Sequence, residues 1–211
     1  MEEVKKRLSD KVDQGKIDRI FPDEPEEVVR KEIEREMEVS IPLFVIGIKD
    51  SIDTTQDNVK KHIAIEILLY LLIGKSSSLY KKLYDEELIM SEPLLEYDFA
   101  NSFAHIAITG QSKEPKKILE GLKGEIAKYK EKGIDEEDFQ RIKNMIYGNY
   151  VKEYNNVSDI CRMFASDFFK GINSFDYIEN SDKISYEYVS SILKDVFDED
   201  KMVISVVKGK G

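Results

Sequence analysis

The sequence predicts an α+β fold in which an antiparallel-rich sheet carries its helices on one face. Segments of β type come in adjacent pairs, at 31–50 and 95–109, rather than alternating with helices. Segments with helical spacing of apolar residues follow each pair, and a last β segment closes the chain at 202–207. Strands grouped in this way are typical of antiparallel sheets with segregated helices.

The first pair of strands is expected at 31–39 and 41–50, the second of which is rich in apolar β-forming residues. Thr54 or Thr55 is in place to cap a helix that ends at Gly74. That helix is apolar on most sides, so we expect it to be buried.

An amphipathic helix with a serine cap is expected at 76–88. Alternation of apolar and acidic residues then predicts a strand around 95–99. The alternation resumes at 103–109 after a turn near Asn101. This arrangement is typical of a β-hairpin.

The C-terminal part is expected to be mainly helical. Pro115 suits a first helical position, and Gly133 lies just past the lysine-rich end of the same helix. Asp135 is expected to cap the next helix. Two more helices, each with a serine N-cap, are predicted at 158–170 and 185–197.

Composition excludes several classes of function. The 211 residues include 42 Asp and Glu against 32 Lys and Arg, a formal charge of -10, which disfavours nucleic acid and anionic membranes as partners. The longest apolar run, 63–73, is interrupted by Glu66 and is too short to span a bilayer. The single cysteine, Cys161, and a charged start without a signal-peptide pattern predict a cytoplasmic location.

The chain divides into two parts by composition. Residues 1–30 are mostly charged, with the breaker DEPEE at 23–27, and are interpreted as a linker or the tail of an upstream domain. Residues 31–211 are expected to form a single α+β domain, with no internal repeat.

A zinc site cannot be assembled from the sequence pattern. Catalytic zinc needs three protein ligands, and an HxxEH motif needs two histidines on one helix. The only histidines, His62 and His105, lie 43 residues apart. Glu66 is one helical turn from His62, a spacing more typical of a surface hydrogen bond. His105 is expected to be a half-buried strand residue.

Other catalytic patterns are equally weak. Cys161 lies inside a predicted helix and is expected to be packed rather than reactive. GKSSS at 74–78 is interpreted as a turn between helices, because no strand and no upstream glycine precede it as in a phosphate loop. Tyrosines recur along the chain and are more typical of a core rim than of a binding surface; they are Tyr80, Tyr84, Tyr97, Tyr147, Tyr150 and Tyr154.

Several segments together resemble a known family. They are SIPLFVIGIKD, LLIGKSSSLYKKLYDEELI, the hairpin to ITG, EPKKILEGLKGEI and IDEEDFQRIKN. In these the chain resembles the second, non-catalytic half of insulinase (pitrilysin) zinc peptidases, nearest the bacterial processing-peptidase-like branch. The likeness runs over about 24–207, and implies the fold of one half of a mitochondrial-processing-peptidase-type metallohydrolase.

The resemblance also implies a division of labour between two homologous halves. In the family, the first half holds the zinc through HxxEH, and the second closes over the substrate to form a chamber. No cofactor is therefore expected in this chain, and zinc is expected in the other half. The family places an Arg and a Tyr in the second half to hold the substrate backbone. Aligned on LYKKL, these positions are Tyr84 and Ser91, and neither matches.

We therefore expect a non-catalytic domain that pairs with a zinc-bearing half or homologous subunit and helps to bind peptide. The alternative is a family-derived scaffold or interaction module without a proteolytic role, which the mismatches at Tyr84 and Ser91 favour. An independent metal hydrolase using His62 and Glu66 is a third hypothesis. Homodimers are a further possibility, because a face normally covered by the other half would be exposed.

Overall fold

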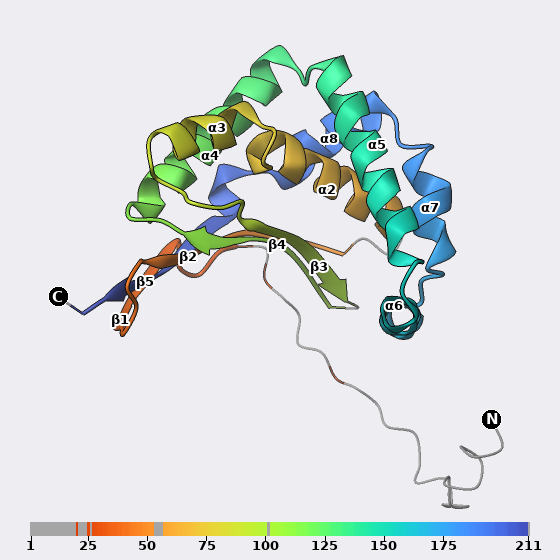
Figure 1. Ribbon diagram of the computed structural model, residues 1–211, viewed down its shortest axis with the longest axis horizontal. Helices are drawn as coiled ribbons and strands as arrows, with labels where there is room; N and C mark the ends of the chain where they lie inside the picture. The colour runs from red at the N-terminus through yellow and green to blue at the C-terminus, as the bar shows by residue number, and fades with distance from the viewer. Residues whose placement is uncertain (1–19, 21–24, 26, 53–56, 101, 211) are drawn as a thin grey trace, which may run out of the picture.

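The computed structural model describes residues 20, 25, 27–52, 57–100 and 102–210. The strands are β1 (Glu32–Met37), β2 (Leu43–Asp50), β3 (Leu94–Ala100), β4 (Phe103–Gln111) and β5 (Met202–Gly209). The helices are α2 (Asn58–Ile73), α3 (Ser78–Asp85), α4 (Pro115–Lys132), α5 (Glu136–Glu153), α6 (Val157–Lys170), α7 (Phe175–Ser181) and α8 (Tyr186–Val196), with a short 3-10 turn, η1 (Glu199–Lys201). Figure 1 shows these helices gathered on one side of a single sheet, which confirms the predicted fold class.

The sheet has the strand order β1-β5-β2-β4-β3. The β2–β4, β2–β5 and β3–β4 pairings are antiparallel, whereas β1 and β5 are parallel. The last strand thus lies between the first two, which do not pair with each other. β5 is apolar enough for an interior position, while the charged β1, EIEREM, is exposed throughout and suits an edge.

The two faces of the sheet differ in burial. Along β2, Phe44, Ile46 and Ile48 are buried beneath the helices. Leu43 and Val45 alternate with them and point to the other side. We call this side, which carries none of the described helices in Figure 1, the open face. Further exposed apolar residues on it are Ile33, Met37, Leu94 and Phe103.

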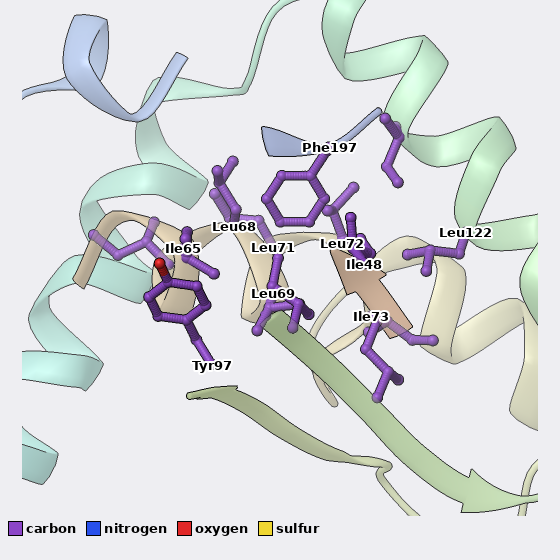
Figure 2. Close-up of a cluster of buried hydrophobic side chains, with 14 of the residues drawn as sticks. Ile48, Ile65, Leu68, Leu69, Leu71, Leu72, Ile73, Tyr97, Leu122 and Phe197 are labelled. Carbon is purple, nitrogen blue, oxygen red and sulfur yellow. The ribbon is translucent and has the colours of Figure 1, made fainter. Parts of the chain in front are cut away.

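Helix α2 forms the centre of the core. It contacts α3, α4, α5, α7 and α8 as well as β3. Side chains on nearly all of its sides are buried, as expected for a helix without a polar face. Figure 2 shows Leu68 and Leu72 gathered with Phe197 and Ile48 in the buried cluster.

The stretch from Asn58 to Asp85 is long and apolar enough, by composition alone, to cross a membrane. However, 72% of its most apolar window is buried inside the fold, as in the core helix of a soluble protein. Its two helices are also separated by a turn at 74–77, so the GKSSS segment is a helix-to-helix turn as predicted.

A buried ion pair joins α2 to the sheet. Lys61 Nζ lies 2.7 Å from Asp50 Oδ2, and both side chains are less than a tenth exposed. The Tyr97 hydroxyl donates to the same carboxylate oxygen over 2.8 Å. The Asp50 carboxylate thus connects β2 with both β3 and α2. Burial and the neighbouring Asp50 carboxylate raise the pKa of Tyr97, which therefore stays a donor. The network fixes the start of α2 against β3.

The helix starts differ from expectation at two places. Asp57 caps α2, accepting from the amides of Val59 and Lys60, whereas Thr54 and Thr55 lie outside the described residues. Asn156 rather than a serine caps α6, because its side chain accepts the amide of Ser158.

One helix is shorter than predicted, and one helix is new. The helix expected at 76–88 spans only Ser78–Asp85, since the chain turns at 86–88 to enter β3. α7 was not predicted, because a seven-residue helix leaves little periodicity. Most of the proposed linker at 1–30, and the turn residue Asn101, lie outside the described residues.

Candidate functional site

A pocket of about 520 Å³ lies beside β3, the edge strand of the sheet. Residues of α2, α5, α6 and α7 form its other walls. In Figure 1, α6 is seen end-on near the end of β3, and Lys170 at the end of α6 reaches Asp98 of β3 over 3.0 Å. The lining side chains that carry polar atoms are His62, Glu66, Glu96, Tyr97, Asp98, His105, Tyr150, Glu153, Tyr154, Ser166, Asp167, Lys170, Ser174 and Tyr177.

His62 lies in the pocket among aromatic rings. The rings of Tyr97, Phe99 and Tyr177 meet it edge to face, with centroids 5.3 to 5.8 Å away. Its Nδ1 is 3.1 Å from the Tyr177 hydroxyl. Burial lowers the pKa of His62 to about 4, so the imidazole is neutral at pH 7.

Glu66 lies one turn further along α2. The Tyr150 hydroxyl donates to Glu66 Oε2 over 2.5 Å. Burial raises the pKa of Glu66 to about 7, and the nearby Glu153 carboxylate acts in the same direction. The pKa of Tyr150 is raised well above its usual value by burial and by Glu66. Near neutral pH this carboxyl group therefore changes charge, and the phenol remains its donor.

His62 and Glu66 do not form the surface hydrogen bond that their spacing suggested. Each is bonded instead to a tyrosine from another helix, α7 or α5. The reason is that this side of α2 faces inward and lines the pocket.

The pocket does not offer a set of metal ligands. Among the described residues, no group of three or more His, Cys, Asp and Glu side chains could hold a metal ion. Both histidines line the pocket, but a zinc site needs at least a third ligand in range. The pocket lining offers hydrogen-bonding groups, aromatic rings and carboxyl groups rather than a set of metal ligands.

Tyr84, Ser91 and Cys161 lie away from the pocket walls, whereas His105 lines the pocket in surroundings other than those expected. Tyr84 on α3 is 53% exposed and stacks on Tyr80, and Ser91 is exposed after the same helix. Cys161, expected to be packed, is exposed on α6, because α6 contributes few residues to the core. His105, expected to be half-buried, is exposed because it points to the open face of β4.

Half of the tyrosines interpreted as a core rim belong to this site: Tyr97, Tyr150 and Tyr154 line the pocket. No pattern in the sequence pointed to Tyr177, Glu153, Asp167 or Lys170. The spacing of His62 and Glu66, one helical turn apart, was the signal that grouped two of the lining residues on one side of a helix.

A family model described as the peptidase M16 inactive domain matches residues 1–146. The match covers more than half of the 211 residues. The chain belongs to this family. The resemblance to the non-catalytic half of a zinc peptidase is thereby confirmed.

Several relatives are about twice as long. An uncharacterized zinc protease of Bacillus subtilis, YmfH, is 26% identical over 200 residues, which is 94% of this chain and 46% of the relative. A solved M16-like peptidase from Alicyclobacillus acidocaldarius is 26% identical, with a TM-score of 0.84 over 91% of this chain and 46% of its own. A protease structure from Helicobacter pylori shares the fold, with a TM-score of 0.80 at 16% identity over 98% of this chain and 51% of its own. The M16 inactive domain therefore spans about half the length of these relatives.

Proposed function

We propose that this M16 inactive domain docks onto a zinc-bearing catalytic half and forms one wall of a peptidase chamber. The observation that carries the proposal is the open face of the sheet, which the described helices leave uncovered. Leu43 and Val45 of the central strand β2 are each more than a third exposed there, and so is Phe103 at the start of β4. Exposed apolar residues on an uncovered sheet face are typical of an interface.

The size of the relatives supports the choice of partner. YmfH and the Alicyclobacillus peptidase each contain as much chain again as the region matched here. A second half of similar size is thus the natural occupant of an uncovered sheet face. The zinc required for peptide hydrolysis would be held by that half, and a reducing, cytoplasmic setting remains our expectation for the assembly.

A role in holding peptide would follow from the position of β3. In the described part of the chain this strand pairs only with β4, so its other edge has free backbone donors and acceptors. An extended peptide adds to such an edge through main-chain hydrogen bonds. We propose this edge as the peptide-binding element of the domain.

The test is reconstitution with a separately expressed zinc-bearing M16 half. We expect a 1:1 complex by light scattering and zinc-dependent peptidase activity that neither part has alone. Val45→Asp, on the open face, should prevent the complex, because a charge would be buried at the interface. The control is Lys81→Asp on α3, which changes charge on the helical side and should leave the complex intact.

Two results would count against the proposal. If Val45→Asp and Lys81→Asp both assembled normally, the open face would not be the interface. If a complex formed without any gain in activity, the alternative of an interaction module without a proteolytic role would be favoured. That alternative is supported by the alignment that the resemblance implies, in which Tyr84 and Ser91 take the positions where the family has Arg and Tyr.

A further inference from the structure

The pocket beside β3 contains polar atoms that the protein itself does not use. Glu66 Oε2 accepts the Tyr150 hydroxyl, and His62 Nδ1 contacts Tyr177, but Glu66 Oε1 and His62 Nε2 bond to none of the described residues. No fully buried side-chain nitrogen or oxygen in the described part lacks a partner. These two atoms must therefore be reachable from the cavity, where a ligand would meet them.

Acidic side chains outnumber basic ones in the lining of the pocket. Lys170 is the cation in its lining, and it is already paired with Asp98. Asp167 accepts the Ser174 hydroxyl over 2.6 Å. Within the described chain, neither Glu66 nor Glu153 has a lysine or arginine partner. A pocket with unpaired carboxylates and a neutral imidazole favours a cationic ligand.

The walls also suit a cation. Tyrosine rings from β3, α5 and α7 surround the cavity, and ring faces attract ammonium and guanidinium groups. Lys170, in the pocket lining, already shows this arrangement. Its Nζ lies 4.8 Å from the centroid of the Phe99 ring while it bonds the Asp98 carboxylate. A second cation in the cavity would also find aromatic rings and carboxylates together.

We propose that this pocket binds an alkyl guanidinium or ammonium group, with Glu66 as its principal anionic contact. The group could belong to an arginine or lysine side chain of a peptide or to a small free amine. Where it belongs to a peptide, the inference rests on the proposed function. The cavity volume of about 520 Å³ leaves room for a long aliphatic stem as well as the charged head.

The charge of Glu66 makes binding depend on pH. Below its pKa of about 7 the carboxyl group is protonated and attracts a cation less, so affinity should rise between pH 6 and pH 8. The other titratable groups that line the pocket are His62, Glu96, Tyr97, Asp98, His105, Tyr150, Glu153, Tyr154, Asp167, Lys170 and Tyr177, and Tyr70 lies on the same helix as Glu66. His62 is already neutral above pH 6, and the raised tyrosine pKa values keep the phenols neutral in this range. Glu153 has a raised pKa as well and would act in the same direction.

The experiment measures binding by the full 211-residue chain, without a catalytic half. Calorimetry with N-acetyl-arginine amide is compared with N-acetyl-citrulline amide, which has nearly the same shape but no charge. Agmatine serves as the free amine. At pH 8 we expect the arginine compound to bind about tenfold more tightly than the citrulline compound, as for one hydrogen bond to a charged group. If agmatine also binds, the pocket is a general cation site. If only the arginine compound binds, the pocket is a site for peptide-borne groups.

Glu66→Gln keeps an acceptor for Tyr150 and removes the charge. We expect it to abolish both the preference for arginine and the rise of affinity with pH. The control is Glu120→Gln on α4, outside the pocket, which should behave like the parent chain. If Glu66→Gln reduced folding, seen as a lost thermal transition, Glu153→Gln would be used instead, with a several-fold loss expected.

Equal binding of the arginine and citrulline compounds, or no binding of either at millimolar concentration, would overturn the proposal. So would a Glu66→Gln chain with unchanged preference for arginine. These results do not depend on assembly with a catalytic half. A chain that binds cations but fails to dock would disprove the proposed function alone.

Discussion

Replacing Glu66 by glutamine should change the pH dependence of stability in a direction that the structure fixes. Burial raises the pKa of Glu66 from 4.5 to about 7, so the folded chain holds this proton more tightly than the unfolded chain does. The stability that comes from the protonated form is present below pH 4.5 and is lost as pH rises through 7. Across that window, at about 1.36 kcal/mol for each pH unit, the loss amounts to about 3 kcal/mol.

His62 contributes with the opposite sign. Burial lowers its pKa from 6.5 to about 4, so the stability due to the neutral imidazole is present above pH 6.5 and is lost as pH falls through 4. In the parent chain the two contributions partly cancel between pH 5 and 7. In Glu66→Gln only the histidine contribution remains from this pair, and the free energy of unfolding should fall more steeply on acidification.

Urea unfolding followed by circular dichroism at pH 5, 6, 7 and 8 measures this effect. Relative to the parent, Glu66→Gln should gain about 2–3 kcal/mol of unfolding free energy between pH 5 and pH 8. Glu120→Gln on α4 is the control and should follow the parent curve, since that side chain is exposed. Curves for Glu66→Gln and the parent that run parallel across pH would refute the buried, proton-holding state of this carboxyl group.

Four further substitutions test the packing and the backbone geometry, each by urea unfolding at pH 7. Lys61→Met should lower the free energy of unfolding by about 3–5 kcal/mol, because it leaves Asp50 buried without its cation. An additional Asp50→Asn should restore part of this loss. An unchanged free energy of unfolding in Lys61→Met would mean that the ion pair is solvated. Gly148→Ala should stabilise by about 0.5–1 kcal/mol, because the new methyl group meets open space on a helix. Gly133→Ala should instead destabilise by about 1 kcal/mol or more at φ +83, and equal effects at the two glycines would contradict the local geometry. Leu72→Ala should cost about 2–5 kcal/mol, and a cost below 1 kcal/mol would place this residue outside the core.

Elements whose signals are local could be predicted from the sequence. Helix α4 begins with Pro115 and ends at Gly133, as its sequence indicated, because both residues act on the backbone nearby. Helix α2 was expected to be buried from its apolar composition, and it is the central helix of the fold. The hairpin of β3 and β4 follows from alternation on either side of a short turn.

Pairings between distant segments could not be predicted in the same way. β5 lies between β1 and β2 although about 150 residues separate it from them. Alternation shows which side of a strand is apolar, but it says nothing about which strand is the neighbour. The parallel pairing of β1 with β5 is therefore a property of the whole chain rather than of either segment.

The candidate site could be predicted only in part, because it also depends on contacts between segments that are distant in the sequence. His62 and Glu66 were grouped correctly on one side of a helix by their spacing. Their hydrogen-bond partners, Tyr177 and Tyr150, come 115 and 84 residues away in the sequence, and Tyr177 lies on the helix that was not predicted. Because burial sets the pKa of both groups, their charge states follow only once the tertiary structure is known.

The buried carboxyl group of Glu66 lowers the stability of the fold, and this loss is informative about the role of the pocket. Around Glu66, the side chains of Ile65, Ile67 and Leu69 are fully buried and apolar, and a leucine at position 66 would continue this pattern. A domain that served only as a wall would be more stable with such a residue, since a buried carboxyl group opposes folding above its pKa. Departures from the stable pattern are expected where a site must bind something. Glu66, beside a neutral His62 and a cavity with unused polar atoms, is thus better explained by ligand binding than by packing.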